Sequence, residues 1–394
     1  MAAQRKTSRY LVPVAVAGIA AATIGLVPAL AASGDPDLPE ITAQQLIEKI
    51  AASDTQTLSG TFKVSTDLGL PAFDGLLSGI AGGSGEGGGS ADPSAQLTKL
   101  VSGTHTLRIA ADGPERQKLT LLDGKEQYSL VHNGDEVWAY DSRSNEVFHE
   151  KGVDEGGPSP EKELPAGPKE LADEVLEAAG DTTSITVGGT AKVAGRDAYR
   201  LVIEPKQQGS TVDSVTIAVD AATGTPLKFT LDSVSGGKPV VDAGFTKVDF
   251  GKPAASEFDF TVPKGAKVTE GGELDRAGGA GKAPEDVEKE LEKHFGDLGL
   301  GGLGDAGGSG PEVIGEGWTT IARFDTGAAA PKAEEAPKEF QGFLDALGDK
   351  VSGKFGSGTV FKTKIVNALM TDDGTVYVGA VTPQKLIDTA NAAK

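Results

Sequence analysis

Few residues of this sequence have the types and spacing that catalysis requires. Its four histidines, His105, His132, His149 and His294, are scattered, and none belongs to a zinc-ligating HExxH motif. There is no GxSxG nucleophile motif, and no glycine-rich segment ends in the Gly-Lys-Ser/Thr of a phosphate-binding loop. His105, His132 and His149 fall on or beside separate predicted strands and could converge in the fold, but their spacing matches no recognised ligand motif. We therefore predict no catalytic residue, no metal site and no cofactor.

The absence of cysteine removes further kinds of chemistry. Disulfides, thiolate catalysis and cysteine-ligated metal centres are excluded, as is a lipid attached to a cysteine at a cleavage site. Paired carboxylates such as Asp372 and Asp373 lie in predicted turns, where a short polar side chain stabilises the turn itself. The sequence predicts a protein that is not an enzyme.

The charge balance narrows the possible partners. Among 394 residues, 57 are acidic and 37 basic, which gives a formal net charge of −20. Nucleic-acid binding needs a basic surface, so this composition predicts no nucleic-acid partner. It also argues against electrostatic capture on an anionic membrane surface. Acidity of this kind keeps an exported protein soluble.

The first residues predict export. Arg5, Lys6 and Arg9 precede an apolar run over residues 11–30, and a small-x-small cleavage site follows at residues 29–31. This is the layout of a secretory signal peptide, and it predicts an extracytoplasmic protein of the cell envelope, secreted after cleavage. Because about 20 apolar residues can also span a bilayer, an uncleaved N-terminal membrane anchor is the alternative.

The chain after this segment alternates between apolar and polar residues in short runs separated by turns. Asp123-Gly124 and Asn133-Gly134 are signals for tight hairpins. Amphipathic helices are predicted over residues 42–52 and 169–179. Antiparallel strands are predicted over residues 58–65, 104–110, 116–122, 127–131, 136–140, 146–149, 184–187, 192–193, 198–204, 214–219, 227–233, 245–250 and 258–261.

These elements predict an α+β fold. Its main part is a half-open, curved antiparallel sheet, or half-barrel, with a helical lid, and a small C-terminal α+β region follows it. In that tail, strands are expected over residues 318–324, 359–365, 367–371 and 375–381, with a helix over residues 340–347. The predicted division is a signal peptide or anchor at 1–31, a half-barrel at 32–268 with a glycine-rich insertion near 75–91, a flexible glycine-rich linker with a short helix at 269–312, and the tail at 313–394.

The apolar positions of the strands predict a buried face, because alternate residues of a strand point to the same side. If the two helices fill the concave side, this face is an ordinary core; if they fit loosely, it encloses a ligand cavity. Trp138 and Tyr140 form an aromatic pair that suits either packing or binding. The candidate ligand-binding residues are Phe62, Val64, Leu107, Leu121, Tyr128, Trp138, Tyr140, Leu201 and Phe229.

Several motifs resemble those of one known family. Residues 134–141 (GDEVWAYD) and 219–228 (VDAATGTPLK) resemble a strand and a hairpin of the LolA-like lipoprotein-sorting proteins. Residues 245–250 and 258–266 resemble the closing strands of that family, and the resemblance extends over residues 40–268. It implies a half-open antiparallel barrel whose apolar concavity, under a helical lid, holds acyl chains.

The resemblance implies a non-enzymatic function of one of two kinds. The first is binding of lipid or of an acylated protein in the lidded half-barrel. The alternative is that of the RseB/MucB-type regulators, which bind the outer segment of a membrane protein. The chain departs from the family in lacking a lipobox cysteine, in its glycine-rich insertion and in its long tail.

Overall fold

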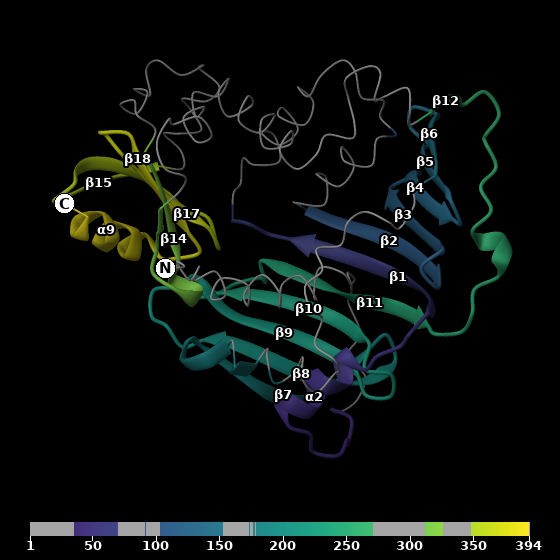
Figure 1. The fold of residues 1–394 in the computed structure, drawn as a ribbon, viewed down its shortest axis with the longest axis horizontal. Coiled ribbons are helices and arrows are strands. Elements are labelled where there is room, and N and C mark those ends of the chain that lie inside the picture. The colour runs from purple at the N-terminus through teal and green to yellow at the C-terminus, as the bar shows by residue number, and fades with distance from the viewer. Residues whose placement is uncertain are drawn as a thin grey trace, which may run out of the picture.

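The computed structural model describes residues 35–69, 91, 103–152, 173, 176–177, 179–270, 312–325 and 348–393. Its dominant feature is an open, curved sheet of 12 strands in the order β12-β6-β5-β4-β3-β2-β1-β11-β10-β9-β8-β7 (Figure 1). The predicted export segment, most of the glycine-rich insertion and the linker lie outside the described residues. The predicted large open sheet is confirmed.

The large sheet is built from two consecutive meanders. The first comprises β1 (Thr57–Thr66), β2 (Gly103–Asp112), β3 (Arg116–Asp123), β4 (Glu126–Asn133), β5 (Glu136–Asp141) and β6 (Glu146–Lys151). The second comprises β7 (Thr183–Val193), β8 (Arg196–Pro205), β9 (Val212–Asp220), β10 (Pro226–Ser233) and β11 (Val241–Asp249). Antiparallel pairing of β1 with β11 joins the two meanders into one sheet.

Glycines at two hairpins have the left-handed backbone that tight turns require. Gly124 (φ 61°) lies between β3 and β4, and Gly134 (φ 64°) lies between β4 and β5. Both follow an Asp or Asn, as the sequence predicted. These turns fix the register of β3, β4 and β5, and therefore which side chains share a face.

The predicted strand over residues 258–261 is wrong. A short 3-10 turn, η4 (Ala255–Glu257), precedes this segment, and the side chain of Phe258 is fully buried without any strand pairing. The chain then forms β12 (Lys267–Glu270), which pairs in parallel with β6 and was not predicted. The alternation of aromatic and polar residues at 258–261 arises because Phe258 and Phe260 pack an irregular segment against the sheet. We call residues 251–270 the strap.

The two predicted strands at 184–187 and 192–193 are one strand, β7. Its pairing with β8 is irregular between Val187 and Thr190, where Gly188 and Gly189 lie. A Cβ on Gly188 would lie 2.5 Å from the Val202 side chain. The glycines therefore interrupt the apolar pattern and allow close approach, without ending the strand.

Helix α2 (Ala43–Ala51) covers part of the large sheet. Thr42 and Gln45 form a capping box at its N-terminus, which satisfies backbone N–H groups there. Its buried residues Leu46 and Ile47 pack in one cluster with residues of β8 and β9, such as Leu201 and Val215. The amphipathic pattern of residues 42–52 thus predicted both the helix and its buried side.

A second sheet has six strands in the order β13-β14-β18-β17-β16-β15. Ile321, Tyr377 and Leu386 lie in a separate apolar cluster shared with the final helix. The predicted strand at 318–324 begins as a 3-10 turn, η7 (Gly317–Thr319), and the predicted helix at 340–347 lies outside the described residues. The elements are β13 (Glu312–Ile314), β14 (Ile321–Asp325), β15 (Gly348–Gly353), β16 (Gly356–Phe361), β17 (Asn367–Thr371), β18 (Thr375–Gly379) and α9 (Pro383–Ala392).

Polar contacts join the second sheet to one end of the large sheet. A β-bridge links Ser210 with Val381, and the Trp318 indole N–H donates to Thr183 Oγ1 at 2.8 Å. The backbone N–H of Lys364 donates to the Leu68 carbonyl at 3.0 Å, just after β1. The contacts therefore involve both meanders of the large sheet. The domain boundaries themselves remain a prediction.

Replacing Lys364 with Met tests one of these contacts. Lys364 Nζ donates a hydrogen bond to Asp67 Oδ2 at 2.7 Å. This bond, and a weaker contribution from the hydrogen bond that the Gly69 N–H donates to the same carboxylate, hold the pKa of Asp67 below its ordinary value. Because Asp67 is partly exposed, we expect the free energy of unfolding to fall by less than about 1 kcal/mol in a urea titration. The loss should shrink at high salt, since screening weakens the pair in the unsubstituted protein.

Lys362→Met is the matched control for this variant, because Lys362 pairs with Asp349 inside the second sheet. A loss at Lys364 that does not change with salt would contradict an electrostatic contribution.

Candidate functional site

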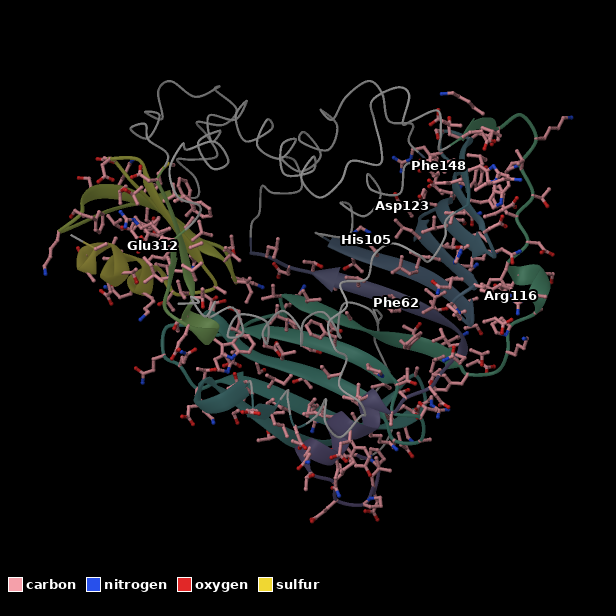
Figure 2. All side chains as sticks on the ribbon, viewed as in Figure 1. Phe62, His105, Arg116, Asp123, Phe148 and Glu312 are labelled. Atoms are coloured by element: carbon pink, nitrogen blue, oxygen red, sulfur yellow. The ribbon has the colours of Figure 1, made fainter. Side chains whose placement is uncertain are left out.

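Strand register places four of the candidate binding residues in one row. Phe62 of β1 is opposite Leu107 of β2, which is opposite Leu121 of β3, which is opposite Tyr128 of β4. Directly opposed residues of antiparallel strands project from the same face. All four side chains are at most 8% exposed. We call this side of the sheet the inner face; Phe62 lies near its centre (Figure 2).

The second meander continues the same face. Val64 is opposite Ala243, which is opposite Phe229 of β10. Phe229 and Leu201 are both opposite Ile217 of β9. The following predicted binding residues therefore lie on the inner face: Phe62, Val64, Leu107, Leu121, Tyr128, Leu201 and Phe229. Apolar side chains thus occupy this face from β4 to β8, in one buried cluster around Phe62 and a second around Leu201.

Trp138 and Tyr140 lie on the opposite, outer face. Leu130 shares the inner face with Tyr128 and is opposite Ala139, so the residues on either side of Ala139 project outward. Trp138 stacks on His149 (ring centroids 3.6 Å apart) and on Phe260 of the strap (5.2 Å). The structure does not bring this aromatic pair together with the other seven candidates. The pair packs the strap against β5 and β6.

His105 and His149 lie on opposite faces of the sheet, and His294 lies outside the described residues. His105 is opposite the inner-face residue Val64, whereas His149 stacks on the outer-face residue Trp138. His149 is 4% exposed, and its Nδ1 lies 2.9 Å from Glu270 Oε2 of β12. Among the described residues, no group of three or more His, Asp or Glu side chains is placed to hold a metal ion. His149 therefore helps to hold the strap.

The helical cover of the inner face lies over the second meander. Leu46 of α2 and Leu176 both belong to the apolar cluster around Leu201. Of the second predicted helix, the described residues Asp173, Leu176, Glu177 and Ala179 are helical. Gln44 Nε2 donates to Asp173 Oδ1 at 2.9 Å, which connects this segment to α2. Its role as a lid remains a prediction.

Ala91 marks a different cover over the first meander. It is 3% exposed and lies in one apolar cluster with Phe62, Leu107 and Tyr128. The Tyr128 hydroxyl donates to the Ala91 carbonyl at 3.2 Å. The connection between β1 and β2 therefore contacts the inner face at this residue. No pattern in the sequence indicated this contact, because the flanking segment is rich in glycine and serine.

A hollow of about 650 Å³ lies beside α2. Its walls carry the charged residues Glu40, Glu48 and Lys49, with Gln45, and at its edge the Tyr199 hydroxyl donates to the Pro39 carbonyl at 3.0 Å. Apolar residues, Pro39, Ile41 and Ala52, share this lining with three charged side chains, whereas an acyl chain needs a wall that is apolar throughout. The apolar surface of the inner face is therefore the stronger candidate site.

The hairpin between β9 and β10 contains a buried network of charged hydrogen bonds and contacts helix α2. Asp220 is 1% exposed and accepts hydrogen bonds from Arg196, from the N–H of Ala222, and from the N–H and hydroxyl of Thr223. Burial alone would raise the pKa of Asp220, but these donors and the charge of Arg196 hold it below its ordinary value. Gly224 (φ 76°) packs so closely that a Cβ would lie 2.3 Å from the Lys49 carbonyl. The hairpin thereby fixes the end of α2 over the inner face.

No family model matches the chain, and no curated protein matches it. Several solved structures are similar to it. A chain of the Pseudomonas aeruginosa MucA/MucB complex is 16% identical, with 88% of this chain and 96% of that chain covered and a TM-score of 0.37. A LolA superfamily protein from Nitrosomonas europaea is 10% identical over 56% of this chain and 99% of its own, with a TM-score of 0.21. An uncharacterized conserved protein from Thermus thermophilus is 15% identical over 58% and 98%, with a TM-score of 0.31.

Two of the three, the MucA/MucB complex and the LolA superfamily protein, carry the names of the families that the sequence motifs resemble. At such identities and TM-scores the similarities do not extend to ligand or partner, which have to be inferred from the residues of this chain. Within the described part of the chain, no helix has the length and apolar character needed to cross a membrane.

Proposed function

We propose that this chain is an exported, non-enzymatic protein that binds a lipid or a lipidated polypeptide on the inner face of its open sheet. The supporting observation is a pair of apolar rows on this face, from Tyr128 to Phe62 in the first meander and from Val64 to Leu201 across the second, which are read from strand register. Strands lie about 4.8 Å apart, so a row across this many strands is long enough for an acyl chain. Each methylene sheltered there would contribute about 0.8 kcal/mol.

The distribution of covering elements supports a site on the first meander. Helix α2 is fixed over the second meander by the Asp220 hairpin, whereas the first meander is contacted by Ala91. We therefore assign the ligand site to the first meander, over Phe62, Leu107 and Leu121.

Native mass spectrometry of protein purified from the cell envelope without detergent tests the proposal. A mass excess that organic extraction removes, and that fragments as lipid, would support it and would identify the bound molecule. A bare polypeptide mass, with no later uptake of fluorescent fatty acid, would overturn it. The regulator-type alternative, binding of a membrane partner's outer segment, would then replace it.

Leu121 and Leu122 provide a matched pair of variants. Leu121 projects from the inner face opposite Leu107, and Leu122 projects from the outer face opposite Thr106. We expect Leu121→Ala to weaken fluorescent fatty-acid binding about tenfold, because it removes apolar contact with the ligand. Leu122→Ala should leave binding unchanged. Thermal unfolding of both variants controls for stability, and equal effects on binding would contradict the assignment to the inner face.

A further inference from the structure

His132 has an unsatisfied ring nitrogen on the inner face of the first meander. It is opposite Gln117 of β3 and Val137 of β5, and it lies two residues beyond the inner-face residue Leu130. Its Nε2 is buried and has no hydrogen-bond partner among the residues that the structure describes. A buried polar atom without a partner costs free energy, and a bound molecule that supplies the partner recovers it.

The apolar surface of the first meander ends at this histidine. Along β3, Leu121 is buried, Leu119 is half-buried and Gln117 is exposed, so the inner face opens to solvent in the direction of His132. The half-buried row, which packs against the buried cluster around Phe62, consists of three directly opposed residues, Ile109, Leu119 and Leu130. An acyl chain that covers the buried and half-buried rows would therefore bring its polar end to His132.

The charges on this face are all negative. At the positions of β1 to β6 that register assigns to the inner face, the structure places no Lys or Arg. It places five carboxylates there: Asp123, Glu126, Asp141, Glu146 and Glu150. The first four lie at the far end of the strands from His132. There, Arg143 of the β5–β6 turn pairs with Asp123 and Glu126, and Lys267 of the strap pairs with Glu146.

Glu150 lies at the same end of the strands as His132. It is exposed and is opposite Val137, which is in turn opposite His132. Two strand spacings separate the backbones of Glu150 and His132 by about 10 Å, which is comparable to the screening length in about 0.1 M salt. A negative charge bound at His132 is therefore repelled by Glu150.

The chemistry of His132 and its surroundings favours an uncharged oxygen over a carboxylate. A neutral imidazole with its proton on Nε2 donates one hydrogen bond, and either kind of oxygen can accept it. A carboxylate would lose hydration at this half-buried position without gaining a cation from the inner face. A carbonyl oxygen of an ester or an amide has a much smaller desolvation cost.

We propose that His132 determines specificity for the polar end of the bound lipid, and that its Nε2 donates to the uncharged carbonyl of an acyl ester or amide. This inference rests on the proposed function, because it requires an acyl chain on the inner face. A free fatty acid binds the same surface but is the poorer ligand.

Two fluorescent probes with the same acyl chain test this proposal on the full exported chain. One probe ends in a free carboxylate and the other in its methyl ester, and binding is measured at low ionic strength and pH 8, where histidine side chains are ordinarily neutral. His132→Phe keeps a planar ring and removes Nε2. His105→Phe is its matched control, at the other end of the same face. Glu150→Gln removes the nearby charge, and Glu204→Gln is its control at an exposed outer-face position of β8.

We expect the unsubstituted protein to bind the methyl ester about tenfold more tightly than the free acid. His132→Phe should weaken binding of the ester about tenfold, because the carbonyl loses its donor, and His105→Phe should leave it unchanged. Glu150→Gln should tighten binding of the free acid and not of the ester, and Glu204→Gln should alter neither.

Two results would overturn the assignment to His132 and leave the proposed function in place. One is tighter binding of the free acid than of the ester, and the other is unchanged binding of the ester by His132→Phe. Binding of neither probe would overturn the proposed function as well. His132→Gln, which retains a donor, should keep more affinity for the ester than His132→Phe, and an equal loss in both would contradict the hydrogen bond. Thermal unfolding of each variant controls for stability.

Discussion

Asp220→Asn should reduce the free energy of unfolding by about 2–3 kcal/mol, because the buried carboxylate loses its charged hydrogen bonds to Arg196, whose own side chain is 33% exposed. Asp220 is 1% exposed, and the carboxylate accepts hydrogen bonds from Arg196 and from the backbone and hydroxyl of Thr223. An amide cannot accept all of these bonds, so Arg196 would be left without its counter-charge. Urea denaturation followed by circular dichroism measures the loss.

We also expect the stability lost in Asp220→Asn to depend on pH. The pKa of Asp220 is lower in the folded protein than its ordinary value, so its carboxylate stabilises the fold above that ordinary value, near pH 4. This contribution is lost as the pH falls through the folded-state pKa. The difference in stability between the unsubstituted protein and Asp220→Asn should therefore be constant near neutrality and should decrease in acid.

Asp197→Asn is the control, because Asp197 pairs with Lys192 at the surface, where it is 44% exposed. It should cost less than about 1 kcal/mol. A comparable loss from both substitutions would contradict a special role of the Asp220 hairpin, and so would a difference that persists unchanged into acid.

The sequence predicted most of the sheet because its strands obey local rules. Alternating residues and Asp-Gly or Asn-Gly turns fixed β3, β4 and β5, and the capping residues Thr42 and Gln45 predicted α2. The motif at 219–228 was recognised as a family resemblance, and its physical role as a buried charge network emerged only from the structure. Its residues act through contacts with Arg196 and Lys49, which are distant in the sequence.

The side of the sheet on which a residue lies was less predictable than the strand itself. Trp138 and Tyr140 are as apolar as the inner-face residues, yet register places them on the outer face, because Ala139 lies between them and is opposite Leu130. A strand covered on both faces has no clear alternation to read. The strap covers the outer face at this place. It is held there by the parallel pairing of β12 with β6, which are more than 100 residues apart in the sequence.

Phe258→Ala should be the second strongly destabilising substitution, with a loss of about 3–5 kcal/mol from the cavity it leaves. Phe258 is fully buried at the start of the strap. The strap is also fixed by Asn133 Nδ2, which donates to the Phe258 carbonyl at 3.4 Å, and by Lys118 Nζ, which donates to the Glu257 carbonyl at 2.9 Å. Removing the aromatic ring should loosen the strap as well as reduce stability.

Trp138 reports that loosening directly, because Phe260 of the strap stacks on its indole. In a Trp318→Phe background, which leaves Trp138 as the only tryptophan, Phe258→Ala should shift its emission to longer wavelength. Amide hydrogen exchange in β12 should accelerate. Asp259→Ala, at the exposed neighbouring position, should change neither signal. If stability falls while Trp138 emission and β12 exchange stay the same, then Phe258 only fills space, and the stacking on Trp138 and the pairing with β6 hold the strap without it.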